Sequence, residues 1–259
     1  MGRLLLRVLL GLVLILPGRP AGADELMVFA ASSLTEAFTD LGRQYEQAHP
    51  GARLVFHFAG SQALAAQISQ GAAVDVFAAA DDQVMTRLLK QGLIETPAFF
   101  AGNSLALIVS RQAVQPIPDL NSLARPGNLL ILGAPSVPVG RYTQRLLDRL
   151  ASDPAYGPAF VAGVRGNLVS EEASVKGVAT KVALGEADAG VVYVSDLTPY
   201  LRERVRVIPL PEVHVPPVRY PVALVTDSSR KVSARRFIDY LLSPQGQRIL
   251  AAHGFLPAR

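Results

Sequence analysis

The chain has 259 residues, with 25 lysines and arginines against 21 aspartates and glutamates, and it has no cysteine. The absence of cysteine excludes disulfides, thiolate catalysis, cysteine-based metal sites and a lipid anchor attached to a cysteine. The length is sufficient to bury a large core without covalent cross-links, in one large domain or two of ordinary size.

Residues 1–23 have the pattern of an export signal. Arg3 and Arg7 supply positive charge, residues 8–16 form an apolar run, and residues 21–23 give the small-x-small pattern of a cleavage site. The apolar run is far shorter than the roughly 20 residues that span a bilayer. We therefore expect cleavage near Ala23, no membrane anchor and a location in the bacterial periplasm.

Removing that signal changes the charge balance. Residues 1–23 hold three arginines and no acidic residue, so the remaining chain carries 22 basic and 21 acidic side chains. It contains no run of lysines and arginines with interleaved aromatic residues. We therefore expect no nucleic-acid partner.

Short apolar segments alternate with amphipathic segments in the first half of the remaining chain. This alternation is typical of βαβ units, which form a mostly parallel sheet covered by helices. Asp81 or Asp82 is the expected cap of the third helix. The predicted strands are 26–31, 53–58, 75–80 and 104–110, and the predicted helices are 34–48, 63–70 and 82–90.

A proline-bearing connection, 116–127, precedes a second alternating series. The predicted strands of this series are 128–133, 189–194, 204–210 and 222–225, and the predicted helices are 141–150, 174–187 and 233–255, the last with a Ser-Pro break.

Two alternating halves without a flexible linker indicate two α/β lobes that share the chain. Such lobes can close about a hinge over a cleft. We expect lobe I from residues 24–106 and 223–259 and lobe II from 107–222, with crossings near 104–110 and 220–225.

Ser33 stands where a predicted strand meets a predicted helix. The stretch from Ser33 to Glu36 matches the S-x-x-E capping box, so one interpretation is that Ser33 only caps its helix, worth about 1 kcal/mol. However, small or hydroxylated residues recur at three further strand-to-helix junctions, in 58–68, 133–147 and 170–182. All four junctions would lie at carboxyl ends of strands, the ligand-binding edge of open α/β sheets.

Such junctions can bind an anion without basic side chains. Helix N-termini carry unpaired N–H groups and the positive end of the helix dipole, and serine hydroxyls add donors. Hydrogen bonds to a charged acceptor are worth roughly 1.5–3 kcal/mol each. A pocket made of donors favours a fully ionised tetrahedral dianion, because the proton of hydrogen phosphate would lack an acceptor there. Tyr193, near the end of its predicted strand, is either a packed core residue or a further donor.

Several segments, in this order, resemble the periplasmic molybdate-binding proteins of ABC importers. They are VFAASSLTEAF (28–38), FAGSQALAAQI (58–68), DVFAAADD (75–82), GAPSVPVGRY (133–142), ASVKGVATKV (173–182) and GVVYVSD (190–196). The C-terminal FIDYLLSPQGQRILAAHGF (237–255) resembles that of the wider substrate-binding family. The resemblance covers essentially the whole chain after the signal. It implies a type II periplasmic binding-protein fold, a molybdate or tungstate ligand held between the lobes, delivery to a membrane permease, and no catalysis.

By position, the resemblance implies five oxyanion-binding residues: hydroxyl donors at Ser33, Ser61 and Tyr193, and backbone donors at Val139 and Val175. It implies no cofactor and no direct metal ligand, and we expect a monomer. The chain departs from the family pattern at three positions. Ser32 adds a hydroxyl that could cap in place of Ser33, glycine at 60 stands where serine is frequent, and Val139 stands where alanine is frequent.

Alternatives remain open. A receptor for sulfate or thiosulfate would use the same donors, and a serine hydrolase using Ser33 or Ser61 would need a base within reach. A zwitterion receptor is disfavoured, because the four junctions offer no obvious carboxylate–arginine pair. Arg141 and Lys176 are either solvated or steer anions toward the cleft. The sequence contains no G-x-S-x-G, P-loop or G-x-G-x-x-G motif, and its histidines are widely spaced, which argues against a metal site: His49, His57, His214 and His253.

Overall fold

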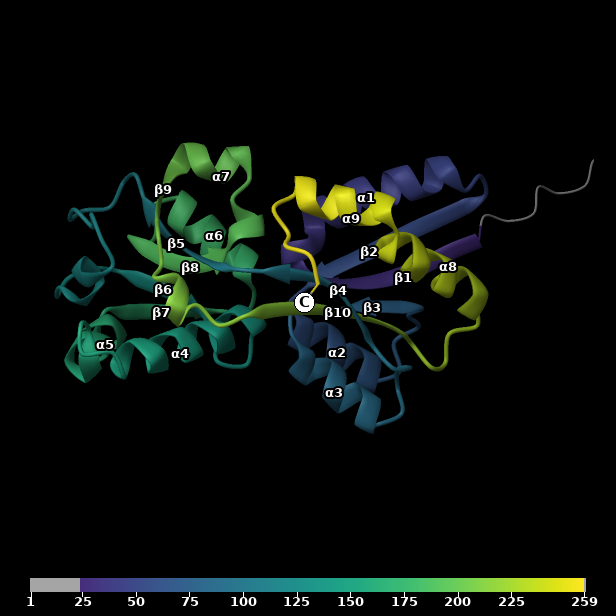
Figure 1. Ribbon diagram of the computed structural model, residues 1–259, viewed down its shortest axis with the longest axis horizontal. Helices are drawn as coiled ribbons and strands as arrows, with labels where there is room; N and C mark the ends of the chain where they lie inside the picture. The colour runs from purple at the N-terminus through teal and green to yellow at the C-terminus, as the bar shows by residue number, and fades with distance from the viewer. Residues whose placement is uncertain (1–23, 259) are drawn as a thin grey trace, which may run out of the picture.

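The computed structural model describes residues 24–258, which form two α/β lobes lying side by side (Figure 1). The predicted signal, residues 1–23, lies outside the described residues. One sheet has the strand order β2-β1-β3-β10-β4 and the other the order β7-β6-β8-β5-β9. Within residues 24–258, no helix has the length and apolarity that a membrane crossing requires.

The first lobe is built on a mixed sheet. Strand β1 pairs in parallel with β2 and β3, whereas β10 runs antiparallel between β3 and β4. Helices α1, α8 and α9 cover one face of this sheet, and α2 and α3 cover the other (Figure 1). The elements are β1 (Asp24–Ala31), α1 (Thr35–Ala48), β2 (Ala52–Ala59), α2 (Ser61–Ser69), β3 (Val76–Ala78), α3 (Asp82–Lys90), β4 (Ala98–Asn103), β10 (Val218–Leu224), α8 (Lys231–Leu242) and α9 (Pro244–Ala252).

Strand β1 is apolar throughout its centre because both of its faces are covered. Successive side chains of a strand point to opposite faces. Accordingly, Val28 belongs to the core cluster that includes Phe38 of α1, whereas Phe29 belongs to the cluster that includes Leu64 of α2 and Met85 of α3. This double burial fixes the carboxyl end of β1 between two layers of helices.

The second lobe is a continuous stretch of chain. Strand β6 runs parallel to β7 and β8, and β5 runs antiparallel to β8 and β9. The elements are β5 (Leu105–Ser110), β6 (Leu130–Gly133), α4 (Pro138–Ala151), α5 (Gly157–Gly166), β7 (Leu168–Glu172), α6 (Val175–Ala183), β8 (Ala189–Tyr193), α7 (Pro199–Arg204) and β9 (Val205–Ile208). Short 3-10 turns complete the described chain: η1 (Ser32–Leu34), η2 (Asn121–Ala124), η3 (Val194–Asp196) and η4 (Glu212–His214).

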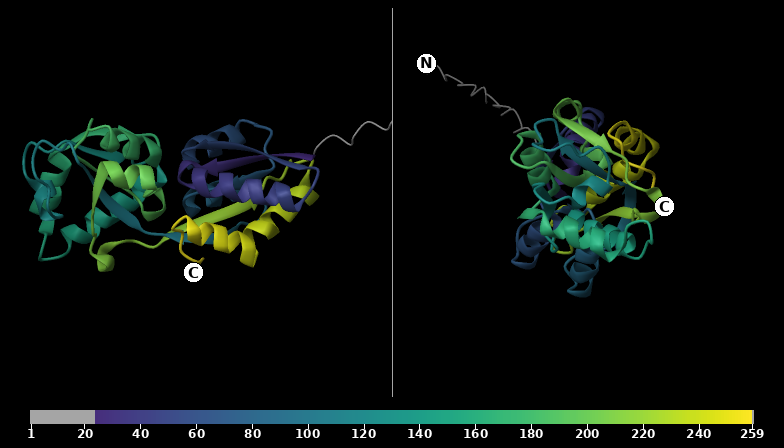
Figure 2. Two further views of the ribbon diagram at one scale, coloured as in Figure 1. Left: turned by 90° about the horizontal axis from the view of Figure 1, so that it is seen from above. Right: turned by 90° about the vertical axis from the view of Figure 1, so that its left-hand side faces the viewer.

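The chain crosses between the lobes twice, and Figure 2 shows the lobes from above with these segments between them. Only Ser104 separates β4 of the first sheet from β5 of the second, and residues 209–217 lead from β9 back to β10. The expected second crossing at 220–225 is wrong in position. Tyr220 already pairs with Ala101, so the expected boundary after residue 222 falls inside β10. The expected boundary after residue 106 likewise falls inside β5, which begins at residue 105.

Candidate functional site

A cavity of about 200 Å³ lies between the lobes, at the ends of the strands that lead into helices. Residues at or after the ends of β1, β2 and β3 form one side, and residues after β6 and β7, with the last residue of β8, form the other. All five residues predicted from the sequence line this cavity: Ser33, Ser61, Val139, Val175 and Tyr193. The structure therefore brings together residues that are up to 160 positions apart in the chain.

Ser33 does not cap helix α1. The residue before α1 is Leu34, and α1 has no side-chain capping hydrogen bond, so neither Ser33 nor Ser32 fills that role. Ser33 instead lies in η1 with its Oγ 2.9 Å from the hydroxyl of Tyr220. The capping interpretation of Ser33 is wrong, because a tertiary partner takes the place of the local one.

Ser61 is the first residue of α2, and its side chain is almost completely buried. The Ala80 N–H donates a 3.1 Å hydrogen bond to the Ser61 Oγ. One lone pair of this oxygen is therefore occupied by the protein, and the hydroxyl proton remains available to the cavity.

Two helices of the second lobe point their N-termini at the same cavity. In α4 the first intrahelical bond runs from Arg141 N to Val137 O, so the N–H of Val139 has no acceptor within its helix. Pro138 precedes it and carries no N–H, as is common for the first residue of a helix. Val175 is the first residue of α6, and its N–H is free of the helix ladder in the same way. Both N–H groups add the positive end of a helix dipole to the cavity wall.

Tyr193 ends strand β8 and is 1% exposed. Its hydroxyl has no hydrogen-bond partner among the described residues. Burial raises the pKa of Tyr193 well above its ordinary value, so the hydroxyl keeps its proton and has a hydrogen bond to donate. A buried hydroxyl without a partner costs about 1–3 kcal/mol, and because Tyr193 lines the cavity, a ligand oxygen bound there can supply the missing partner.

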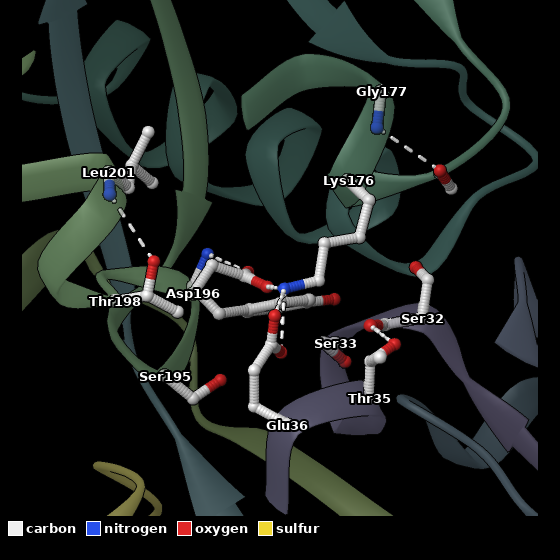
Figure 3. Close-up of polar contacts among 12 residues, drawn as sticks. Ser32, Ser33, Thr35, Glu36, Lys176, Gly177, Ser195, Asp196, Thr198 and Leu201 are labelled. Carbon is white, nitrogen blue, oxygen red and sulfur yellow. Dashed lines mark hydrogen bonds and ion pairs between the residues drawn. The ribbon is translucent and has the colours of Figure 1, made fainter. Parts of the chain in front are cut away.

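None of the described residues that line the cavity is an acid, a lysine, an arginine or a histidine. Charges stand just outside it, in ion pairs that join the lobes. The Lys176 Nζ lies 2.8 Å from both carboxylate oxygens of Glu36 and 3.6 Å from Asp196 Oδ1 (Figure 3). Arg141 of α4 pairs with Asp81, the residue that also caps α3. Arg141 and Lys176 are therefore both held in ion pairs, and each is partly exposed beside the cavity.

Asp196 is buried behind Tyr193. Its Oδ2 accepts a 3.0 Å hydrogen bond from the Tyr193 N–H. Burial raises the pKa of Asp196 to about 6, an effect larger than the opposing one of the nearby Lys176 ammonium. This carboxyl holds the end of β8, and thereby the Tyr193 ring, in place.

The surroundings of the serines do not support hydrolysis. Across the described chain, neither Ser33 nor Ser61 has a histidine or a carboxylate among its hydrogen-bond partners. Residues 24–258 also contain no group of three or more side chains that could hold a metal ion. A second cavity, of about 420 Å³ inside the second lobe, is lined almost entirely by apolar side chains and offers an anion no donors.

A donor-lined cavity between two α/β lobes, without a nucleophile and base, defines a solute-binding protein. The sequence pattern of bacterial extracellular solute-binding proteins matches residues 26–256. The molybdate-binding protein ModA of Mycobacterium tuberculosis is 38% identical, over 92% of this chain and 87% of its own length, and ModA of Escherichia coli is 32% identical, over 90% of each chain. The periplasmic molybdate-binding protein of Azotobacter vinelandii has the same fold, with a TM-score of 0.77 at 20% identity, over 90% of this chain and 100% of its own.

The chain belongs to the bacterial extracellular solute-binding proteins and, within them, to the ModA family. This membership confirms the predicted family, the two-lobed fold class and the prediction of a transport receptor rather than an enzyme. It also agrees with a location outside the cytoplasm.

Proposed function

We propose that this protein captures molybdate between its lobes and delivers it to the permease of an ABC importer. The observation that carries the proposal is the convergence of three hydroxyls and two helix-terminal N–H groups on one uncharged cavity. The relatives named for molybdate binding support the choice of ligand. Tungstate has nearly the same size and the same charge, so the same donors serve it.

The donors explain how a dianion is held without a formal counter-charge. Each hydrogen bond from Ser33, Ser61, Tyr193, Val139 or Val175 to a charged oxygen contributes roughly 1.5–3 kcal/mol. Together these bonds offset much of the cost of removing the ion from water. A protonated oxyanion such as hydrogen phosphate is disfavoured, because its proton would meet donors.

We propose that ligand binding closes the two lobes. The cavity takes Ser33 and Ser61 from the first lobe and the other three donors from the second. The ligand therefore gains all its contacts only when the lobes meet, which favours the closed form by the difference in contacts. The rotation would occur at Ser104 and at residues 209–217, where the chain passes between the sheets.

We further propose that residues 1–23 are a cleaved signal and that the protein acts as a freely diffusing monomer in the periplasm. The charge and apolar pattern of these residues supports export. A receptor that collects a solute and passes it to a permease has to reach both, which favours an unanchored protein.

The test is calorimetric titration with molybdate, tungstate, sulfate and phosphate. We expect tight binding of molybdate and tungstate and much weaker binding of the other two. Ser33→Ala and Ser61→Ala should each weaken molybdate binding by roughly 10- to 150-fold, the equivalent of one charge-assisted hydrogen bond. Ser69→Ala, on the exposed end of α2, is the matched control and should bind as the wild type does.

Two results would contradict the proposal. Equal affinity for sulfate and molybdate would show that the site is not specific for molybdate and would favour another oxyanion as the ligand. Unchanged dissociation constants in both serine variants would remove the cavity as the binding site.

A further inference from the structure

We propose that Asn103 and Tyr220 form a hydrogen-bond relay that points the hydroxyl proton of Ser33 into the cavity and so sets the selectivity of the site. Neither residue lines the cavity, and both are buried. The inference rests on the proposed function, because it assigns positioning roles to two residues behind the same oxyanion site.

The direction of the relay begins with the side-chain amide of Asn103. The Ser104 N–H lies 2.9 Å from the Asn103 Oδ1. A backbone N–H can only donate, so the atom facing it is the carbonyl oxygen and the other end of the amide is the NH₂ group. That NH₂ lies 3.2 Å from the Tyr220 hydroxyl and 2.8 Å from the Ser195 Oγ, which accounts for both of its protons.

Tyr220 links Asn103 to Ser33 through its hydroxyl. Its side chain is completely buried, and its hydroxyl accepts the bond from Asn103. Among the residues that the structure describes, the one acceptor for the phenol proton is the Ser33 Oγ, at 2.9 Å. If Ser33 donated instead, the phenol proton would be buried without an acceptor, which is unfavourable. Burial also raises the pKa of Tyr220 well above its ordinary value, so the proton stays on the phenol.

The Ser33 Oγ therefore accepts a hydrogen bond from the Tyr220 hydroxyl and directs its own O–H into the cavity. In the same way, the Ser61 Oγ accepts a 3.1 Å hydrogen bond from the Ala80 N–H, which leaves the Ser61 proton for the cavity. Both serines thus present protons to the ligand. An oxyanion without protons accepts them, whereas a ligand oxygen that carries a proton of its own meets another proton.

The relay lies in the first lobe next to both crossings, and its Asn103 amide also contacts the second lobe. Asn103 ends β4 immediately before the first crossing, and Tyr220 lies in β10 just after the second. Ser195, the second acceptor of the Asn103 amide, belongs to η3 of the other lobe. The arrangement of the crossing segments is therefore linked to the direction of one hydroxyl in the site.

The test is a double-mutant cycle measured by calorimetric titration of molybdate and phosphate at pH 8. Tyr220→Phe removes the donor to Ser33 and should weaken molybdate binding about 2- to 12-fold, the range of one ordinary hydrogen bond. It should also narrow the preference for molybdate over hydrogen phosphate, because Ser33 can then turn and accept. In the Ser33→Ala background, Tyr220→Phe should have no further effect on either ligand.

Tyr240→Phe is the matched control. Its hydroxyl is buried without a partner among residues 24–258, outside the cavity, so this variant should keep the wild-type affinities and preference. Circular dichroism and thermal unfolding without ligand will show whether each variant folds. Should Tyr220→Phe fail to fold, Asn103→Ala in the presence and absence of Ser33→Ala tests the same coupling.

Equal losses from Tyr220→Phe with Ser33 present and absent would overturn the relay, as would an unchanged preference between molybdate and phosphate. The proposed function is tested separately by the wild type. If the wild type does not bind molybdate, the proposed function fails. If it binds molybdate but the effects of Tyr220→Phe and Ser33→Ala are additive, only the relay is contradicted.

Discussion

Lys176 in the first turn of α6 places its Nζ 2.8 Å from both carboxylate oxygens of Glu36 in α1. This ion pair joins the second lobe to the first beside the cavity. The lysine follows Val175, a proposed backbone donor to the ligand. Arg141 and Asp81 form a second pair between the lobes near Val139. These cations are thus neutralised by partners in the opposite lobe, and the proposed donors to the ligand are all neutral groups.

Replacing Lys176 with methionine should weaken molybdate binding modestly. The Lys176 and Glu36 side chains are 29% and 40% exposed, so solvent screens the pair and we expect a loss of roughly 2- to 5-fold. The loss should shrink at high salt, because salt screens partly exposed charges. The measurement is calorimetric titration at low and high sodium chloride concentration.

Lys181→Met is the control for the lysine substitution. Lys181 lies in the same helix and pairs with Glu172 of the same lobe, so this variant loses the same charge without breaking a contact between lobes. Equal losses in the two variants would show that only the net charge matters.

Tyr193→Phe should separate stability from binding. The hydroxyl is buried without a protein partner, so its removal should raise the free energy of unfolding without ligand by about 1–2 kcal/mol. Molybdate binding should fall by roughly 10- to 150-fold, because a donor to a charged oxygen is lost. Urea unfolding and calorimetric titration of the same preparation measure the two effects. A variant that is less stable and binds normally would assign Tyr193 to packing alone.

Asp196→Asn should change how stability depends on pH. The folded-state pKa of Asp196 is about 6, against about 3.9 for an aspartate in an unfolded chain. Between these values the folded chain holds more protons, so the free energy of unfolding falls as pH rises through the window, by about 3 kcal/mol from this group. Above about pH 6 the wild type lacks the whole of this contribution to the free energy of unfolding, and below about pH 4 the contribution is fully present.

Asparagine keeps the shape of the side chain and an oxygen for the Tyr193 N–H, but it does not titrate. The stability of Asp196→Asn relative to the wild type, from urea unfolding, should therefore rise by about 3 kcal/mol between pH 4 and pH 7. A difference that is constant over this range would show that Asp196 has an ordinary pKa in the folded protein.

Gly60→Ala should impair closure while sparing the first lobe. The backbone of Gly60, at φ −62° and ψ 135°, suits any residue, but an added Cβ would lie 2.5 Å from the Ala173 carbonyl oxygen of the second lobe. Overpacking of this kind typically costs 1–3 kcal/mol, so affinity should fall about 5-fold or more. Unfolding without ligand should change little.

Gly166→Ala, in a helix of the second lobe with no neighbour near the added Cβ, is the control and should bind normally. Wild-type affinity in Gly60→Ala would show that ligand binding does not require the close contact between Gly60 and Ala173.

Local patterns were sufficient to predict most of the fold. The buried strands around Val28 and Val76 are continuous apolar runs with helices behind them, and these were predicted close to their observed places. Strand β7 was missed because it is a partly exposed edge strand that ends in Ser170, Glu171 and Glu172. Helix α5 was missed because it is short and contains glycines at 157, 163 and 166, which lower its helix propensity.

The start of β10 and the relay were beyond local patterns for a different reason. Pro221 lies within β10, and a proline in an apolar segment argues against a strand. The five cavity residues were predicted because each belongs to a strand-to-helix junction or to a quoted motif. Tyr220 belongs to neither, and it meets Ser33 across 187 positions of sequence. Contacts of that separation depend on the finished sheet.

The strand order of the first sheet also bears on how the chain reaches its native state. Strand β4 has β10 as its partner in that sheet, and β3 meets β10 on one side, so both wait for residues that are made more than a hundred positions later. All five strands of the other sheet lie between residues 105 and 208 and pair only with one another. During synthesis from the N-terminus, the inserted half can therefore fold while the half that begins the chain is still incomplete.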